Sequence, residues 1–197
     1  MAWRPTRAQL EAARGRGVRD IVAPRLDVLF VGINPGLYTA AIGHHFGRPG
    51  NRFWAALHRA GFTPRQLSPF EERELLALGL GVTNVVNRAT GAADELSDDD
   101  LRAGARALTR KVRRLAPGFV AFFGLGAYRV GFGRPTAAVG EQPEGIGESR
   151  VWLLPNPSGR TAGYQLDAIV SELARLRQAA LSARSSTTTG IGRRVRR

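Results

Sequence analysis

The sequence predicts an α/β fold: a three-layer α/β/α domain around a central, mainly parallel sheet of four strands. Two features of the chain indicate this fold class. Short apolar runs alternate along the chain with segments whose apolar residues repeat at helical spacing. The length of 197 residues, with 43% hydrophobic and 23% charged residues, is typical of one globular domain that buries its own core.

The predicted strands are continuous apolar runs bounded by glycine, proline or polar residues, the pattern of strands buried on both faces of a sheet. They lie at 26–31, 82–86, 119–123 and 151–154. Ligands of such sheets bind beyond the carboxyl ends of the strands, so we expect a functional site in the loops that follow them. These loops span 32–50, 84–96, 124–126 and 155–163.

The predicted helices begin and end at capping residues. Asn51 can cap a helix that ends at Gly61. Residues 68–71, Ser-Pro-Phe-Glu, form a capping box with proline at the first helical position. Ser97, followed by three aspartates that suit the helix dipole, opens a helix that runs to about residue 116. The same signals predict two further helices, at 127–130 and 166–176.

Basic residues are concentrated at the two ends of the chain. The sequence carries 29 Lys and Arg against 16 Asp and Glu, a net charge of +13. We divide it into a basic N-terminal arm (1–19), a folded domain (20–181) and a basic tail (182–197) that is rich in Ser and Thr and expected to be disordered. Such ends suit a polyanion, most often a nucleic acid, although a solubilising tail has the same composition.

Several classes of site are excluded or disfavoured by composition. Cysteine is absent, which excludes disulfides, thiolate nucleophiles and cysteine-ligated metals. No apolar run approaches the 18 residues of a membrane span, and no secretory signal opens the chain, so we expect a cytoplasmic protein that works on nucleoid DNA. His44 and His45 are adjacent, but no third ligand follows at a metal-binding spacing, so no metal site is predicted.

Two of the expected loops share one construction, an asparagine placed before a proline directly after a strand. The first strand ends in GINPG at 32–36, and the fourth ends in PNPSG at 155–159. Proline restricts the backbone on both sides of its peptide bond, so an asparagine mounted in this way is rigidly aimed. Two such loops at the same end of one sheet indicate a site rather than two ordinary turns.

These motifs resemble those of the bacterial mismatch-specific uracil-DNA glycosylases and their animal relatives, the thymine-DNA glycosylases. The resemblance covers residues 20–180 and is carried by five motifs: GINPGL (32–37), PGNRFW (49–54), AGFT (60–63), GVTNVV (81–86) and VWLLPNPSG (151–159). It implies a uracil-DNA glycosylase-like fold and hydrolysis of the N-glycosidic bond of uracil paired with guanine in double-stranded DNA. In that family the base is flipped into a pocket, and the reaction starts base-excision repair without metal or cofactor.

The resemblance also implies roles for individual residues. Asn34 stands beside the water that attacks the sugar; its amide orients that water by accepting a hydrogen bond. Phe46 stacks on the base, and backbone groups near Ile33 contact the base edge. Asn84 reads the pyrimidine edge through an amide that both donates and accepts. Gly36 replaces a bulky residue of strictly uracil-specific enzymes and leaves room for a 5-substituent.

The loop at 156–162 is expected to insert into the duplex. Asn156 is a pocket or transition-state contact, and Ser158 bonds a phosphate. Where the bacterial family carries a leucine wedge this chain has Arg160, which can stack on bases and pair with the orphaned guanine. The residues assigned to this DNA-binding wedge are Ser158, Gly159, Arg160 and Thr161.

Two other functions stay open from the sequence. The same fold could recognise a damaged base or an abasic site without cleaving it. Alternatively, Gly124-Leu125-Gly126 could belong to a nucleotide-binding turn, although Arg129 stands where the dinucleotide fingerprint needs its third glycine. Thymine, ethenocytosine and deaminated purines are expected as secondary substrates of a glycosylase, and a monomer is the simplest assembly.

Overall fold

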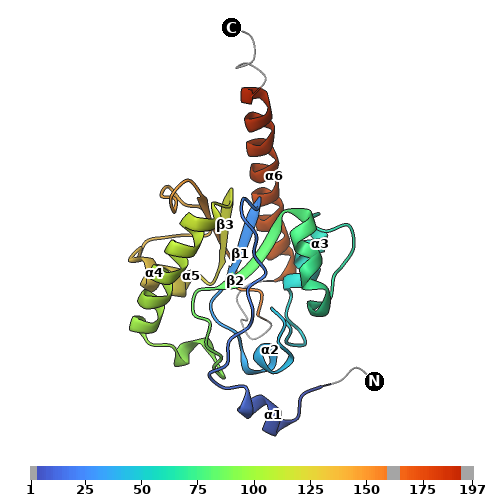
Figure 1. Ribbon diagram of the computed structural model, residues 1–197, viewed down its shortest axis with the longest axis vertical. Helices are drawn as coiled ribbons and strands as arrows, with labels where there is room; N and C mark the ends of the chain where they lie inside the picture. The colour runs from blue at the N-terminus through green and yellow to red at the C-terminus, as the bar shows by residue number, and fades with distance from the viewer. Residues whose placement is uncertain (1–3, 159–164, 192–197) are drawn as a thin grey trace.

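The chain folds around one five-stranded sheet with the strand order β2-β1-β3-β5-β4 (Figure 1). The computed structural model describes residues 4–158 and 165–191, with side chains as far as residue 185. The strands are β1 (Val28–Gly32), β2 (Leu80–Asn84), β3 (Phe119–Phe123), β4 (Gly140–Glu141) and β5 (Arg150–Leu154). β1 pairs in parallel with β2 and β3, and β3 pairs in parallel with β5.

The predicted α/β class is confirmed, but the expected number of strands was wrong. β4, two residues long and antiparallel to β5, lies within the Gly- and Pro-rich segment between β3 and β5. A pair this short carries no alternation that a sequence pattern could reveal. β2 also begins two residues before the predicted run, because Leu80 pairs with Val28 at the start of the sheet.

Helices cover both faces of the sheet. They are α1 (Arg7–Ala12), α2 (Leu37–Ile42), α3 (Phe53–Arg59), α4 (Asp98–Leu115), α5 (Leu125–Phe132) and α6 (Leu166–Ile191), with 3-10 helices η1 (Pro69–Leu78) and η2 (Ala93–Glu95). Ser97 caps α4 as predicted, with its hydroxyl accepting the Asp100 N–H at 3.1 Å. The N-cap residue of α3 is Arg52 rather than the predicted Asn51, which lies one residue earlier and accepts the Phe53 N–H at 2.9 Å through Oδ1. α1 and α2 were not predicted, since six residues are too few to show helical periodicity.

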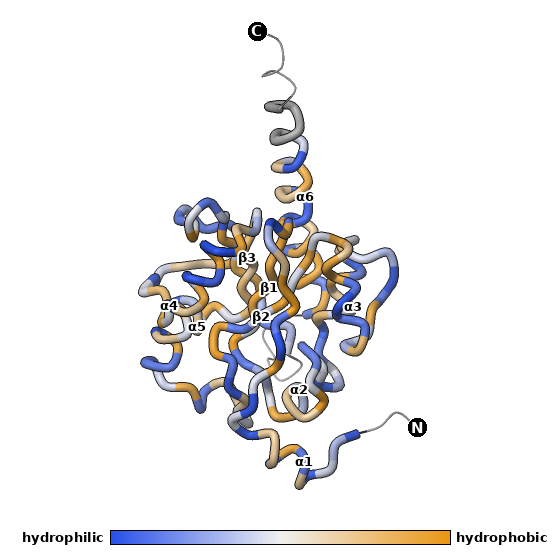
Figure 2. Tube along the Cα trace, in the orientation of Figure 1, coloured by the Kyte–Doolittle hydropathy of each residue, from blue (hydrophilic) through white to orange (hydrophobic). Residues whose placement is uncertain are grey.

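Alternate residues of β1 enter the two halves of the core. Val28 and Phe30 pack in the cluster that includes α3 and α6, whereas Leu29 and Val31 pack in the cluster under α4. The strands carry the most continuous hydrophobic colour in Figure 2. None of the helices in the described part of the chain is both long enough and apolar enough to cross a membrane.

The structure describes part of each basic end of the chain. After α1, Ala13 and Val18 are buried, at 0% and 2% exposure, against Ala40 and Ala89, so this part of the N-terminal segment is packed on the domain. Residues 182–191, expected as disordered tail, continue α6. Helices extend more easily than they nucleate, so the packed part of α6 provides a start for the polar residues that follow.

Candidate functional site

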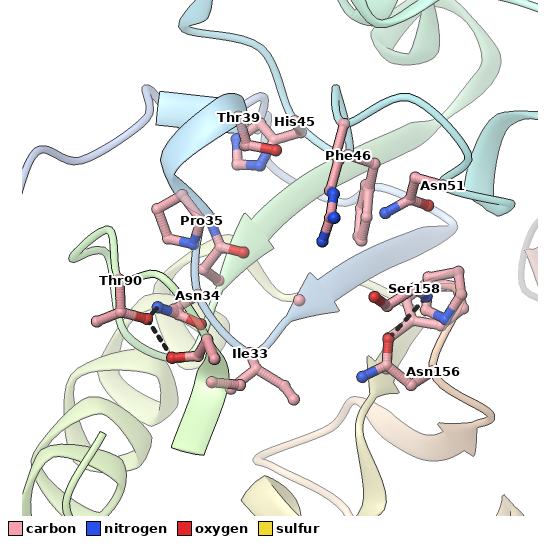
Figure 3. A pocket seen from close by; sticks show the side chains of 18 of the residues that line it. Ile33, Asn34, Pro35, Thr39, His45, Phe46, Asn51, Thr90, Asn156 and Ser158 are labelled. Carbon is pink, nitrogen blue, oxygen red and sulfur yellow. Dashed lines mark hydrogen bonds between the residues drawn. The ribbon is translucent and has the colours of Figure 1, made fainter. Parts of the chain in front are cut away.

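A cavity of about 420 Å³ opens at the carboxyl end of the sheet (Figure 3). Its walls come from the loops after β1, β2 and β5, together with Phe123 at the end of β3. The chain turns from β1 to β2 on one side and places β3 on the other, so the loop after β1 leaves the sheet at its topological switch point. Of the four loops expected from the sequence, the structure brings those after β1, β2 and β5 together around one pocket, whereas residues 124–126 do not line it.

Asn34 lines the pocket with a side-chain amide that is locked in orientation. Its Nδ2 donates to the Arg88 carbonyl oxygen at 2.9 Å and to Thr90 Oγ1 at 2.7 Å. Both N–H bonds are therefore used, and a flip of the amide would bring its oxygen against the Arg88 carbonyl. Oδ1 stays available as a hydrogen-bond acceptor for a water or ligand in the pocket.

Thr90 is a site residue that the sequence analysis missed. It is 3% exposed, lines the pocket, and its hydroxyl accepts from Asn34 while donating to the Ala92 carbonyl oxygen at 2.6 Å (Figure 3). A threonine in a loop carries no local signal of this role. It is recognised only because the fold places it beside an asparagine 56 residues earlier in the chain.

Phe46 lies at the pocket wall in a strained backbone conformation. Its φ angle is +52°, in the left-handed region that an aromatic residue rarely adopts. Its ring stacks on Phe53, with ring centroids 4.0 Å apart and an interplanar angle of 18°. Strain of this kind costs about 1–3 kcal/mol and persists only where the surroundings impose it, which favours a functional position for this ring.

The loop that carries Phe46 is anchored by a buried carboxylate. Glu72 of η1 is 4% exposed and accepts from the His45 backbone N–H at 2.7 Å, and its other oxygen lies 2.9 Å from His44 Nδ1. The His45 ring is also buried, with Nε2 3.0 Å from the Arg19 carbonyl oxygen. Burial lowers the pKa of His45 below its ordinary value of 6.5, so the ring is neutral at physiological pH. The two histidines therefore support the loop that carries Phe46.

Asn84 ends β2 and lines the pocket. The side chain is 7% exposed, and its Nδ2 is buried without a hydrogen-bond partner in the protein. An unpaired buried donor is costly, so this nitrogen is a strong candidate to donate to a bound ligand. A Cβ on Gly32 would lie 2.5 Å from Asn84 Oδ1, so only glycine at 32 leaves room for this amide.

Ile33 and Gly36 line the same pocket on either side of Asn34. Gly36 is exposed, and a Cβ built there would meet no atom within 4 Å. Space beside this residue is therefore open. Gly36 also starts α2 with an ordinary extended backbone, so its conformation would tolerate a side chain.

The loop after β5 contributes Asn156 and Ser158 to the pocket. Asn156 Oδ1 accepts the Ser158 N–H at 3.0 Å, which leaves the Asn156 amide nitrogen as a donor (Figure 3). Arg52 holds this loop: its backbone N–H donates to the Pro157 carbonyl oxygen at 3.0 Å, and its Nη2 donates to the Ser158 carbonyl oxygen at 2.7 Å. The sequence analysis did not single out Arg52.

The remaining wedge residues, Gly159, Arg160 and Thr161, lie outside the described residues. In the part of the chain that the structure describes, no three His, Asp or Glu side chains gather closely enough to hold a metal ion. The residues that line the pocket offer amides, hydroxyls, backbone groups and an aromatic ring, together with the charged residues Arg48 and Asp94.

The chain matches the model of a known protein family. Residues 19–178 match the model of the uracil DNA glycosylase superfamily. The chain belongs to this superfamily. Its fold also matches the solution NMR structure of a protein from Methanosarcina acetivorans, provisionally named a uracil DNA glycosylase, with a TM-score of 0.55 and 17% identity over 83% of this chain and 98% of that one. Members of the superfamily act on DNA as glycosylases, and at this identity the solved structure supports the fold.

Proposed function

We propose that this protein is a monofunctional DNA glycosylase that hydrolyses the N-glycosidic bond of uracil paired with guanine, and so starts base-excision repair. The observation that carries the proposal is the amide of Asn34, which lines the pocket and is fixed in orientation by two hydrogen bonds. An acceptor whose orientation cannot reverse is what a hydrolytic site needs to hold one water for attack. The family membership supplies the substrate class, and the mismatch preference rests on the motifs.

The base must leave the stack before it can react. In the proposed complex the flipped uracil stacks on Phe46, whose far face is supported by Phe53. Asn84 Nδ2, unpaired in the free protein, donates to a carbonyl oxygen of the base. Binding then satisfies a buried donor, which favours a base that presents an acceptor at that position.

Hydrolysis needs no strong base in this site. The bond between C1′ and N1 of uracil breaks, its electron pair leaves with the base, and the sugar acquires oxocarbenium character. Asn34 Oδ1 accepts one hydrogen bond from a water, whose oxygen then bonds to C1′ and whose proton passes to solvent. Because an amide orients but does not deprotonate this water, we expect a slower reaction than a carboxylate would support.

The open space beside Gly36 supports a substrate range wider than uracil. Thymine, ethenocytosine and other modified bases carry atoms where a bulky residue would exclude them. We propose that Asn156 contributes a pocket contact, while Ser158 and the residues 159–161 meet the duplex. Arg160 would fill the space of the flipped nucleotide and contact the opposite guanine.

A cleavage assay on defined duplexes tests the proposal. Duplexes with a single G·U, A·U or G·T pair are incubated in EDTA with the protein or its Asn34→Ala variant. We expect uracil release from G·U by the parent and a loss of two to three orders of magnitude in the variant. Tight binding without release from any duplex would instead support a module that recognises damaged bases without cleaving them.

A further inference from the structure

The structure links the N-terminal segment to the asparagine of the pocket. Residues 4–18 precede the family match at 19–178, and by charge alone they look like a DNA-binding arm. We propose that residues 13–18, through Asn87, position Asn34, so that this segment supports the reaction rather than only DNA affinity. The inference rests on the proposed role of Asn34 in hydrolysis.

Residues 15–18 pair with the segment that holds Asn34. The Gly15 N–H donates to the Ala89 carbonyl oxygen at 2.9 Å, and the Ala89 N–H donates to the Arg16 carbonyl oxygen at 2.9 Å. Asn87 completes the pairing with its side chain: Oδ1 accepts the Val18 N–H at 2.8 Å, and Nδ2 donates to the Val18 carbonyl oxygen at 3.0 Å. These four bonds lie on either side of Arg88, whose carbonyl oxygen accepts from Asn34.

The packing around these bonds leaves little freedom to move. A Cβ on Gly17 would lie 2.8 Å from Asn87 Nδ2 and 3.0 Å from the Asn87 carbonyl oxygen, so the close approach requires glycine. Ala13 and Val18 are buried against Ala89. Small side chains and a glycine thus allow two backbone segments to meet at hydrogen-bonding distance.

Thr90, the second hydrogen-bond partner of Asn34, is also held by contacts that lead to the N-terminal segment. Thr90 Oγ1 donates to the Ala92 carbonyl oxygen, and the Ala92 N–H donates to Glu95 Oε1 at 3.0 Å. Arg14 in turn donates to Glu95 Oε2 at 2.8 Å. Both acceptors that orient the Asn34 amide, the Arg88 carbonyl and the Thr90 hydroxyl, are therefore held by contacts that lead back to residues 14–18.

This arrangement makes Asn87 a positioning residue with a testable signature. Asn87 lies at the surface, so Asn87→Ala removes its two side-chain bonds without opening the core. A displaced Arg88 carbonyl would loosen the Asn34 amide, and misplacement of a reacting group lowers the rate of the bound complex. We expect the single-turnover cleavage rate at saturating protein to fall about tenfold, with the Kd for an uncleavable duplex unchanged.

Matched variants distinguish a loss of Asn34 positioning from a loss of positive charge that binds DNA and from a general loss of folding. Arg7→Ala removes one positive charge from the exposed face of α1, away from these bonds, and should weaken DNA binding without changing the saturated rate. In an Asn34→Ala background, Asn87→Ala should have no further effect on the rate. A parental rate in Asn87→Ala, a loss confined to Kd, or an additive loss in the double variant would each overturn the proposal.

A readout that needs no cleavage distinguishes this proposal from the proposed function. The Asn34 side-chain NH₂ signals, assigned in a ¹⁵N-labelled sample by their loss in Asn34→Ala, should shift in Asn87→Ala and stay in place in Arg7→Ala. If the parent cleaves no duplex, the glycosylase proposal fails, and these signals still decide whether Asn87 positions Asn34. Unchanged signals in Asn87→Ala would refute the positioning role.

Discussion

Removal of the Thr90 hydroxyl tests directly whether the hydrogen bond from Asn34 fixes the orientation of the Asn34 amide. Thr90→Val keeps the branched shape of the side chain but deletes the acceptor 2.7 Å from Asn34 Nδ2. The amide then keeps one of its two bonds, the one to the Arg88 carbonyl oxygen. A typical net hydrogen bond is worth about 0.5–1.5 kcal/mol, which corresponds to a rate loss of about 2- to 12-fold if the bond serves to orient the amide.

The assay is single-turnover cleavage of a G·U duplex at saturating protein, with duplex affinity measured separately. Thr90→Ser is the matched control, since it restores the hydroxyl and should recover most of the rate. Asn34→Ala should lose far more than Thr90→Val, and adding Thr90→Val to it should change nothing. A Thr90→Val protein as fast as the parent, or a Thr90→Ser protein as slow as Thr90→Val, would refute the argument that this hydroxyl orients Asn34.

Three further predictions concern other parts of the pocket and the loop beyond it. Gly36→Phe should fill the open space beside the pocket and reduce cleavage of 5-substituted bases more than cleavage of uracil. The measurement is the ratio of the kcat/KM values for the two kinds of base. An unchanged ratio would show that this position does not limit substrate size. Burial keeps His45 neutral in the folded protein, so below pH 6.5 the unfolded chain binds a proton that the folded chain does not. The free energy of unfolding should fall by up to about 1.4 kcal/mol per pH unit there, and denaturant titrations should find a shallower fall in His45→Gln. Arg160→Ala should weaken turnover on duplex DNA more than on single-stranded uracil DNA, and equal losses on both substrates would remove the wedge assignment.

Local signals in the sequence were sufficient for the longer strands, for several helix starts and for the location of the pocket, but not for the short elements α1, α2 and β4. The run at 119–123 is a strand with the predicted bounds, because continuous apolar residues between Gly118 and Gly124 leave few alternatives. Ser97 starts its helix as expected, since capping depends on residues three positions apart. The Asn-Pro loops also lie at the carboxyl end of the sheet, where parallel topology places every loop that follows a strand.

The residues that hold the pocket in place could not be predicted, because they make contacts between parts of the chain that lie far apart in the sequence. Thr90 meets Asn34 across 56 residues, and Asn87 meets Val18 across 69. No pattern in neighbouring residues reveals such pairs, because they arise when packed elements bring two loops together. The N-terminal segment shows this most clearly: its charge predicted a basic arm that suits a polyanion, whereas Gly17 and the small residues around it allow a close contact that charge does not report.

The sequence by itself thus determined which residues can form strands, helices and rigid loops, since these depend on neighbours within a few positions. Only the tertiary structure decided that Asn34 has one fixed orientation, that Asn84 keeps an unpaired donor, and that Phe46 is held in a strained conformation. The physical reason is that orientation, burial and strain are properties of the packed chain, set by partners that folding brings together from far apart.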